Sequence, residues 1–166
     1  MHRVYSVKNH HPLTINDISK LEAISNKKFD LFERLLLIDL GNTQHLLEVV
    51  HNTETKIRVI KQVEEKNIIK RKSCIISSTN NILAYANSKI YCKKMPLQVL
   101  VEIRERRNGI GKILLYHKLE IFKKITEIGY ASGLHIFKNY SLYHKEHLIC
   151  RINEIFPIQL KKSKSI

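Results

Sequence analysis

The sequence has no tryptophan and few of the residues that mark disordered or fibrous chains. Its 166 residues include five glycines and three prolines, far fewer than low-complexity or collagen-like proteins contain. Hydrophobic residues make up 43% of the chain and charged residues 27%, which are ordinary values for a folded protein. A chain of this length fits one hydrophobic core, so we expect residues 1–166 to form a single domain.

Cysteine is also scarce. Cys74, Cys92 and Cys150 form no CxxC pair, and an odd number argues against a disulfide framework. Cys74 and Cys150 lie in apolar strand patterns, where a free thiol behaves as a small hydrophobic group. The simplest explanation is a reducing compartment.

Long apolar segments are missing. The longest compact apolar run, residues 35–38, is far too short to cross a membrane. Residues 1–6 lack the apolar core of a signal peptide. We therefore expect no membrane association.

Common catalytic and metal-binding motifs are absent as well. The nine histidines include the close pairs His10–His11 and His144/His147, but neither pair has the spacing of a helical zinc site or of a Cys/His finger. The chain contains no GxSxG motif, no P-loop and no GxGxxG after a strand. We therefore expect no metal site and no nucleotide loop.

Acidic residues are too few to balance the basic ones. The chain has 29 Lys and Arg against 15 Asp and Glu, a formal net charge of +14. Compositional drift toward lysine, an anionic small substrate and nucleic acid remain as explanations. The basic stretches carry no interleaved aromatics and no helix-turn-helix spacing, so the sequence does not favour nucleic acid. The abundance of Ile, Lys and Asn is typical of an AT-rich genome, such as that of a plastid or a reduced bacterium.

The hydrophobic pattern predicts helices first and hairpins afterwards. We expect helices at residues 14–25, 29–40, 44–51 and 96–106. We expect strands at residues 57–63, 69–77, 82–91, 137–143 and 148–156. Residues 108–111 should form a loop, and the periodicity of residues 118–128 favours a helix. This order indicates an α+β fold with an antiparallel sheet.

Local signals mark several of these helix ends. Thr14 or Asn16 is suited to cap the first helix, and Asn42 or Thr43 the third. Gly41 is suited to the position that ends the second helix.

The last expected strand carries a carboxylate on its apolar face. With a period of two, that face consists of Leu148, Cys150, Ile152, Glu154 and Phe156. A carboxylate among apolar side chains is costly unless it is paired, protonated or used. Glu154 is therefore a candidate site residue, although a glutamate at a strand end could also reach solvent.

Arg71 offers the complementary charge. It shares a strand face with Ile69, Ser73 and Ile75. An inward-facing arginine would grip a carboxylate with its bidentate fork. The alternative is an edge-strand arginine that extends to water beside its two flanking lysines.

Two loops could supply backbone N–H donors. Residues 41–43 precede an expected helix, where free N–H groups and the helix dipole favour an anion. Gly109 and Gly111 flank Ile110 and allow close approach of a ligand. Ordinary capping and turn formation is the alternative explanation for both loops.

Four stretches, in this order, resemble the chorismate lyase family. They are residues 35–43 (LLLIDLGNT), 84–88 (AYANS), 109–115 (GIGKILL) and 153–157 (NEIFP). The likeness covers residues 29–157 and leaves 158–166 as a basic tail. The chain is similar, more closely still, to a plastid-encoded algal reading frame of this superfamily.

The resemblance implies an antiparallel sheet with N-terminal helices on one face and an enclosed ligand cavity under helical flaps. It also implies that residues 118–128 form a strand, against the periodicity, and we follow the resemblance there. A soluble monomer in the plastid stroma, or otherwise in the cytoplasm, would agree with the likeness.

The resemblance also implies an activity. Members of the family eliminate the enolpyruvyl group of chorismate as pyruvate and leave 4-hydroxybenzoate, without a metal or cofactor. The ligand would be a small anionic aromatic or cyclohexadiene carboxylate. By position, Arg71 would pair with the ring carboxylate, and Glu154 would meet the ring hydroxyl and assist proton movement. The N–H groups of Asn42 and of Ile110, with Gly111 beside it, would hold ligand oxygens.

The sequence departs from the family pattern in three places. Gly109 stands where proline is usual, and Asn42 stands where methionine or a similar residue is usual. Ser73 could occupy the carboxylate-binding position in place of Arg71. A non-catalytic binding domain for a small aromatic or carboxylate ligand therefore remains an alternative, and a basic nucleic-acid-associated module is a second one.

Overall fold

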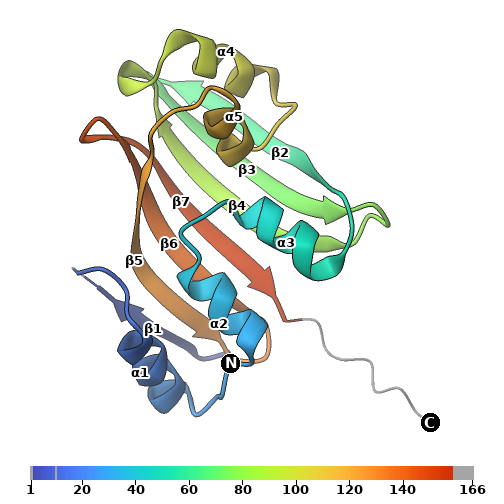
Figure 1. Cartoon of the computed structure of the whole chain (residues 1–166), viewed down its shortest axis with the longest axis vertical. Helices are drawn as coiled ribbons and strands as arrows, with labels where there is room; N and C mark the ends of the chain where they lie inside the picture. The colour runs from blue at the N-terminus through green and yellow to red at the C-terminus, as the bar shows by residue number, and fades with distance from the viewer. Residues whose placement is uncertain (1, 10, 159–166) are drawn as a thin grey trace.

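The structure, a computed structural model, describes residues 2–9 and 11–158, and in these residues the chain forms an α+β fold around one antiparallel sheet (Figure 1). The basic tail expected at residues 158–166 lies outside the described residues apart from Ile158. The strands are β1 (Val4–Lys8), β2 (Thr55–Glu65), β3 (Ile68–Ser77), β4 (Ile82–Tyr91), β5 (Phe122–Ala131), β6 (His135–His144) and β7 (His147–Pro157). The helices are α1 (Ile15–Ser25), α2 (Leu31–Ile38), α3 (Thr43–His51), α4 (Leu97–Glu105) and α5 (Ile110–Tyr116), with a 3-10 turn at Cys92–Lys94.

The sheet consists of two meanders joined side by side. Its strand order is β1-β5-β6-β7-β4-β3-β2, and every neighbouring pair is antiparallel. Strands β2 to β4 form one meander and β5 to β7 the other, and pairing of β4 with β7 joins them. Strand β7, the last of the described strands, therefore lies at the centre of the sheet.

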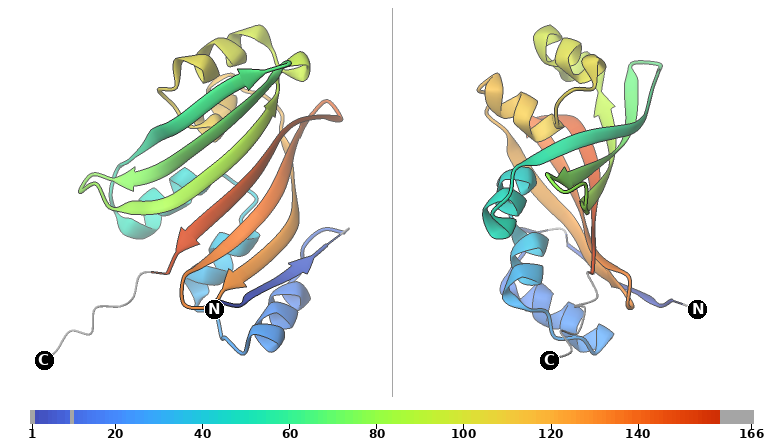
Figure 2. Two further views of the ribbon diagram at one scale, coloured as in Figure 1. Left: turned by 180° about the vertical axis from the view of Figure 1, so that it is seen from behind. Right: turned by 90° about the vertical axis from the view of Figure 1, so that its right-hand side faces the viewer.

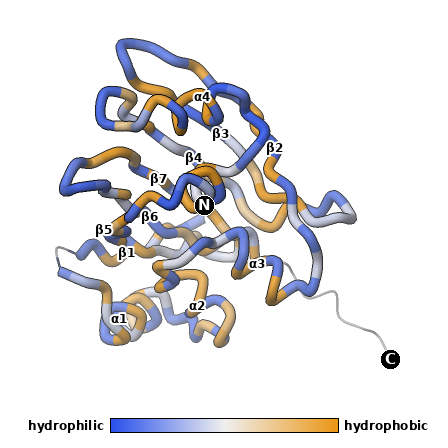
Figure 3. Tube along the Cα trace, turned by 45° about the horizontal axis from the view of Figure 1, so that its top comes forward, coloured by the Kyte–Doolittle hydropathy of each residue, from blue (hydrophilic) through white to orange (hydrophobic). Residues whose placement is uncertain are grey.

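The helices all pack on one face of the sheet, as the side view in Figure 2 shows. Each contributes side chains that are almost fully buried, namely Leu21, Leu37, Leu47, Val99 and Ile113. They contact apolar residues of the covered sheet face such as Ile69, Ile90, Ile128 and Ile136. Hydrophobic residues accordingly recur at intervals along both helices and strands (Figure 3). None of the described helices is long and apolar enough to span a membrane.

Most predicted elements are confirmed, including the caps of two helices. Thr14 is the N-cap of α1 and Asn42 the N-cap of α3. The prediction for Gly41 is wrong, because α2 ends earlier, with Asp39 as its C-cap. The backbone N–H of Gly41 instead donates to Asp39 Oδ1 at 3.0 Å in the short connection to α3. The expected loop at residues 108–111 is also shorter, since α5 begins at Ile110.

The hydrophobic period of residues 118–128 favoured a helix, and this was wrong. The strand that the family resemblance implied is confirmed as β5. The helical prediction rested on apolar residues three apart, including Ile125 and Ile128. A β-bulge between Ile125 and Glu127 inserts one extra residue, so residues three apart point to the same sheet face. Both isoleucines are buried in the core as a result. A bulged strand thus imitates the spacing of a helix.

A buried carboxylate joins α1 to α2. Glu22 Oε1 accepts hydrogen bonds from the Phe29 backbone N–H and from Arg34 Nη2, both at 2.9 Å, and Lys28 Nζ lies 3.2 Å from Oε2. The Phe29 bond, aided by the two cations, lowers the pKa of Glu22 to about 2 from the ordinary 4.5. This carboxylate fixes the turn between two of the helices that cover the sheet.

We expect Glu22→Gln to destabilise the fold in a pH-dependent way. The folded-state pKa lies below the unfolded one, so Glu22 contributes stability above pH 4.5, and this contribution is lost as the pH falls toward 2. Urea unfolding should show the largest difference between wild type and variant at neutral pH and a shrinking difference in acid. Glu105→Gln is the matched control, because Glu105 is exposed and forms no salt bridge with a described residue. A constant difference across this pH range would contradict the assignment.

Candidate functional site

Two adjacent cross-strand rows on the helix-covered face bring the candidate residues together. The first, the Arg71 row, consists of Arg71, Ser88, Ile152 and Tyr140 on strands β3, β4, β7 and β6. The second, the Glu154 row, consists of Ser73, Ala86, Glu154 and Lys138 on the same strands. Because every second residue of a strand points to the same face, both rows point toward the helices.

A pocket of about 270 Å³ opens over these rows. This volume is near the lower end of the range for small-molecule sites, roughly 300–1,000 Å³. Arg71 and Glu154 both line it, and the small side chains of Ala86 and Ser88 lie between them in the two rows. The pocket therefore has room for a ligand about the size of one ring between a cation and a carboxylate. Closure of the pocket around a ligand stays a prediction.

Arg71 is a buried cation without an acidic partner among the residues that the structure describes. Its side chain is 2% exposed, and it faces the core rather than water. Nε donates to Gln62 Oε1 at 2.7 Å, Nη1 donates to the Asn108 carbonyl at 3.1 Å, and Nη2 donates to the Ile103 carbonyl. Burial lowers the pKa of the guanidinium to about 10, so it remains charged at neutral pH. Three neutral acceptors orient the group, and two of its five N–H donors remain for a ligand.

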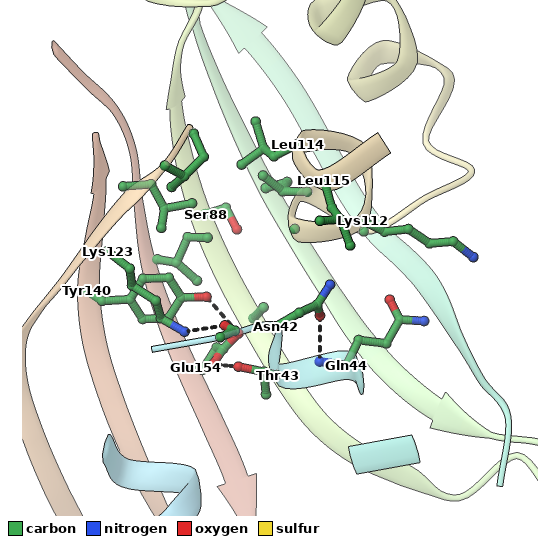
Figure 4. A pocket seen from close by; sticks show the side chains of 18 of the residues that line it. Asn42, Thr43, Gln44, Ser88, Lys112, Leu114, Leu115, Lys123, Tyr140 and Glu154 are labelled. Atoms are coloured by element: carbon green, nitrogen blue, oxygen red, sulfur yellow. Dashed lines mark hydrogen bonds between the residues drawn. The ribbon is translucent and has the colours of Figure 1, made fainter. Parts of the chain in front are cut away.

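Glu154 is held by two hydroxyl donors, which Figure 4 shows, and by one lysine. Oε1 accepts from the Tyr140 hydroxyl at 2.7 Å, and Oε2 accepts from the Thr43 hydroxyl at 2.8 Å. Lys138 Nζ lies 3.5 Å from Oε2. Burial beside this carboxylate raises the pKa of Tyr140 well above 10, so the phenol keeps its proton and donates. The strand-end alternative, in which Glu154 reaches solvent, does not match a residue that is 6% exposed.

Two lysines lie beside Glu154 in unlike environments. Lys138 is fully buried, and its Nζ donates to the Asp39 carbonyl at 3.3 Å. Lys123 on β5 lines the pocket, where its Nζ donates to the Gly41 carbonyl at 3.1 Å and lies 4.3 Å from the centroid of the Tyr140 ring. The pKa of Lys123 is lowered to about 8, mainly because the group is buried and secondly because the positive charge of Lys138 is near.

The first turns of α3 and α5 form the rim of the pocket. Asn42 caps α3, and its Oδ1 accepts from the backbone N–H groups of Gln44 and His45 at 3.0 and 3.4 Å. A Cβ added to Gly111 would lie 3.6 Å from Asn42 Nδ2, so the two loops approach closely. Asn42, Ile110 and Gly111 all line the pocket. The structure thus brings together all five site residues expected from the sequence, although hydrogen bonding of the three rim residues to a ligand stays a prediction.

Comparison with known protein families agrees with this geometry. The family model described as chorismate pyruvate-lyase Rv2949c-like matches residues 36–164, which is well over half of the chain. The chain belongs to this family. A search of curated proteins found no match.

The departure from the family pattern at Gly109 has a packing explanation. A Cβ at this position would lie 3.0 Å from Ile57 Cγ1 and 3.3 Å from Gln44 Oε1. The loop before α5 therefore packs so closely on β2 and α3 that a larger residue would have to displace a neighbour. Glycine permits this approach.

The choice between Arg71 and Ser73 does not arise in the form that the sequence suggested. Both residues line the pocket. Ser73 belongs to the Glu154 row, and Arg71 belongs to the adjacent row. Arg71 is the one of the two that carries charge, so an anionic group would be attracted to its row.

Sequence reasoning missed four polar residues around Glu154, namely Thr43, Lys123, Lys138 and Tyr140. One signal was available, because Lys138 lies between Ile136 and Tyr140 on an alternating face that should be apolar. An inward lysine needs an anion nearby, and Glu154 is its cross-strand partner. Lys123 could not be placed while β5 was of uncertain type. No group of three or more His, Cys, Asp or Glu among the described residues is placed to hold a metal.

We expect Lys138→Met to destabilise the protein by about 3 kcal/mol, because removal of one partner leaves a buried carboxylate with less compensation. Adding Glu154→Gln should recover part of the loss, since the uncompensated charge disappears. Urea unfolding of the two single variants and the double variant measures the coupling. Additive effects of the two substitutions would show that Lys138 does not compensate Glu154.

Proposed function

We propose that the protein is a chorismate lyase, which converts chorismate to 4-hydroxybenzoate and pyruvate. The observation that carries the proposal is that Arg71 and Glu154 line one pocket from adjacent rows of the same sheet face. Membership of the chorismate pyruvate-lyase Rv2949c-like family supports the same chemistry. The site residues proposed below are Arg71, Glu154, Asn42, Ile110 and Gly111.

Arg71 would bind the ring carboxylate of the substrate. Its buried guanidinium has no acidic partner among the described residues, and its orientation is fixed by Gln62 and two carbonyl groups. A carboxylate would supply the missing countercharge and accept the remaining N–H donors in a charge-assisted pair. This contact would orient the ring across the small side chains of Ala86 and Ser88.

Glu154 would meet the ring hydroxyl at the other end of the pocket. The hydroxyl would donate to the carboxylate, which Thr43 and Tyr140 hold in place. In the reaction, the bond between the ring carbon and the enolpyruvyl oxygen breaks, and the neighbouring carbon that bears the hydroxyl loses its hydrogen as a proton. The departing enolpyruvate gains a proton to become pyruvate, and the ring becomes aromatic. Because aromatisation drives the step, the protein mainly needs to orient the substrate and assist proton movement.

The rim would complete the binding site. Backbone N–H groups of Asn42 and Ile110, with Gly111 leaving space beside them, would donate to ligand oxygens. This role depends on the backbone, so the unusual side chain of Asn42 does not remove it. The proposed reaction needs no cofactor.

The family resemblance and the Ile, Lys and Asn bias of the sequence also support a wider proposal. The protein would be encoded in a plastid, related to an algal reading frame of the superfamily, and would act in the stroma as a single-domain monomer. Size-exclusion chromatography with light scattering tests the monomer.

The activity is tested by incubating purified protein with chorismate and following 4-hydroxybenzoate by absorbance and pyruvate by a coupled assay. We expect Glu154→Gln to lower kcat by about 100-fold or more with little change in KM. Arg71→Met should lower kcat/KM by about 100-fold or more, because a buried charge contact is lost. Arg151→Met is the matched control. Arg151 is an exposed residue of β7, the strand that pairs with β4, and it does not line the pocket.

Tight binding of chorismate by wild-type protein without product above the uncatalysed rate would overturn the lyase and favour a non-catalytic binding domain. Equal activity of wild type and Glu154→Gln would remove Glu154 from the mechanism.

A further inference from the structure

The charged residues that line the pocket do not balance one another. Arg71 is buried and Lys123 is partly buried, and both are cationic; Glu154 is anionic but already has Lys138 as its ion-pair partner, and Lys112 is exposed to water. A ligand with one carboxylate would leave an excess of positive charge in a largely buried site. A ligand with two carboxylates would balance it, and chorismate carries one on its ring and another on its enolpyruvyl side chain.

We propose that Lys123 binds this second, side-chain carboxylate, while Arg71 binds the ring carboxylate. The inference rests on the proposed function, because it assigns a further contact to the same ligand in the same pocket. It makes Lys123 the residue that distinguishes the dicarboxylate substrate from the monocarboxylate product.

The sheet places Lys123 at the opposite end of the pocket from Arg71. Arg71 lies on β3 and Lys123 on β5, four strand steps away, or about 19 Å at roughly 4.8 Å per step. Lys123 Nζ lies over the Tyr140 ring, and the hydroxyl of that ring donates to Glu154. The enolpyruvyl group of chorismate is attached next to the carbon that bears the hydroxyl. A ligand with its hydroxyl at Glu154 therefore brings its second carboxylate toward Lys123.

The two other lysines near the pocket are less suited to this role. Lys138 is fully buried, does not line the pocket and is paired with Glu154. Lys112 is exposed on α5, and Figure 4 shows its side chain directed away from Glu154. The Lys123 ammonium group, by contrast, donates to the carbonyl of Gly41, and two of its three donors remain for a ligand.

The test compares the affinities of Lys123→Gln and wild-type protein for chorismate and for 4-hydroxybenzoate, by calorimetry or by KM and product inhibition. Loss of a charge-assisted contact should raise the Kd for chorismate by roughly 10- to 100-fold. The Kd for 4-hydroxybenzoate, which lacks the second carboxylate, should stay within about twofold. Lys124→Gln is the matched control, because the next residue of the strand points to the other face and does not line the pocket.

Unchanged binding of 4-hydroxybenzoate also shows that the variant is folded with an intact pocket. An equal loss for both ligands, or no loss for chorismate, overturns the role of Lys123 while leaving the lyase proposal in place. Differential binding without turnover supports Lys123 and overturns the lyase. If wild-type protein binds neither ligand, both proposals fail.

The pH dependence of chorismate binding gives an independent readout. The groups near Lys123 are Lys138 and Tyr140 on β6, Glu154 on β7 and Asp39 after α2. The pKa of Lys123 in the free protein is lowered to about 8 and that of Tyr140 is raised. Lys123 is charged below its pKa, so affinity should be steady at lower pH and fall as the pH rises above 8, by up to tenfold per unit. Lys123→Gln should abolish this fall, and an identical profile in the variant contradicts the proposal.

Discussion

The buried carboxylate of Glu154 is the interaction on which the site depends. It lies on the central strand β7 and accepts hydrogen bonds from Tyr140 of the neighbouring strand and from Thr43 of α3. Without these donors and Lys138, a carboxylate in this core would be strongly destabilising. The compensation of one charge therefore fixes the first turn of α3 against the sheet, and that turn carries one rim of the pocket.

The other end of the site also depends on a buried charge, which here is the cation of Arg71. Arg71 is as deeply buried as Glu154, yet it contacts only neutral acceptors among the described residues. Its contacts with the Ile103 and Asn108 carbonyls join β3 to the end of α4 and to the loop before α5. One guanidinium thus positions the second rim and also lines the pocket. A charge that is oriented by neutral groups but not neutralised is suited to bind an anion.

Small residues provide the space between these charges. Ala86 and Ser88 on β4 lie between Arg71 and Ser73 on one side and Glu154 and Ile152 on the other. Larger side chains there would fill the 270 Å³ pocket. The sheet therefore combines full burial of two charges with an unfilled gap between them, an arrangement that favours ligand binding over core packing.

The sequence by itself determined the two hairpins and the strand faces that Arg71 and Glu154 share with apolar residues, and it narrowed the N-caps of α1 and α3 to two residues each, because these depend on local hydrogen bonding and on alternation along one strand. Family resemblance, carried by short motifs, added the strand nature of β5 that the period of three concealed. The tertiary structure decided which strands are neighbours, and hence that Lys138 and Tyr140 support Glu154 and that Lys123 reaches the pocket. Pairing between strands far apart in the chain, and the bulge in β5, set these contacts. Strand pairing leaves no periodic signal in the sequence and the bulge leaves a misleading one, since both depend on packing between segments and not on the order of residues within one.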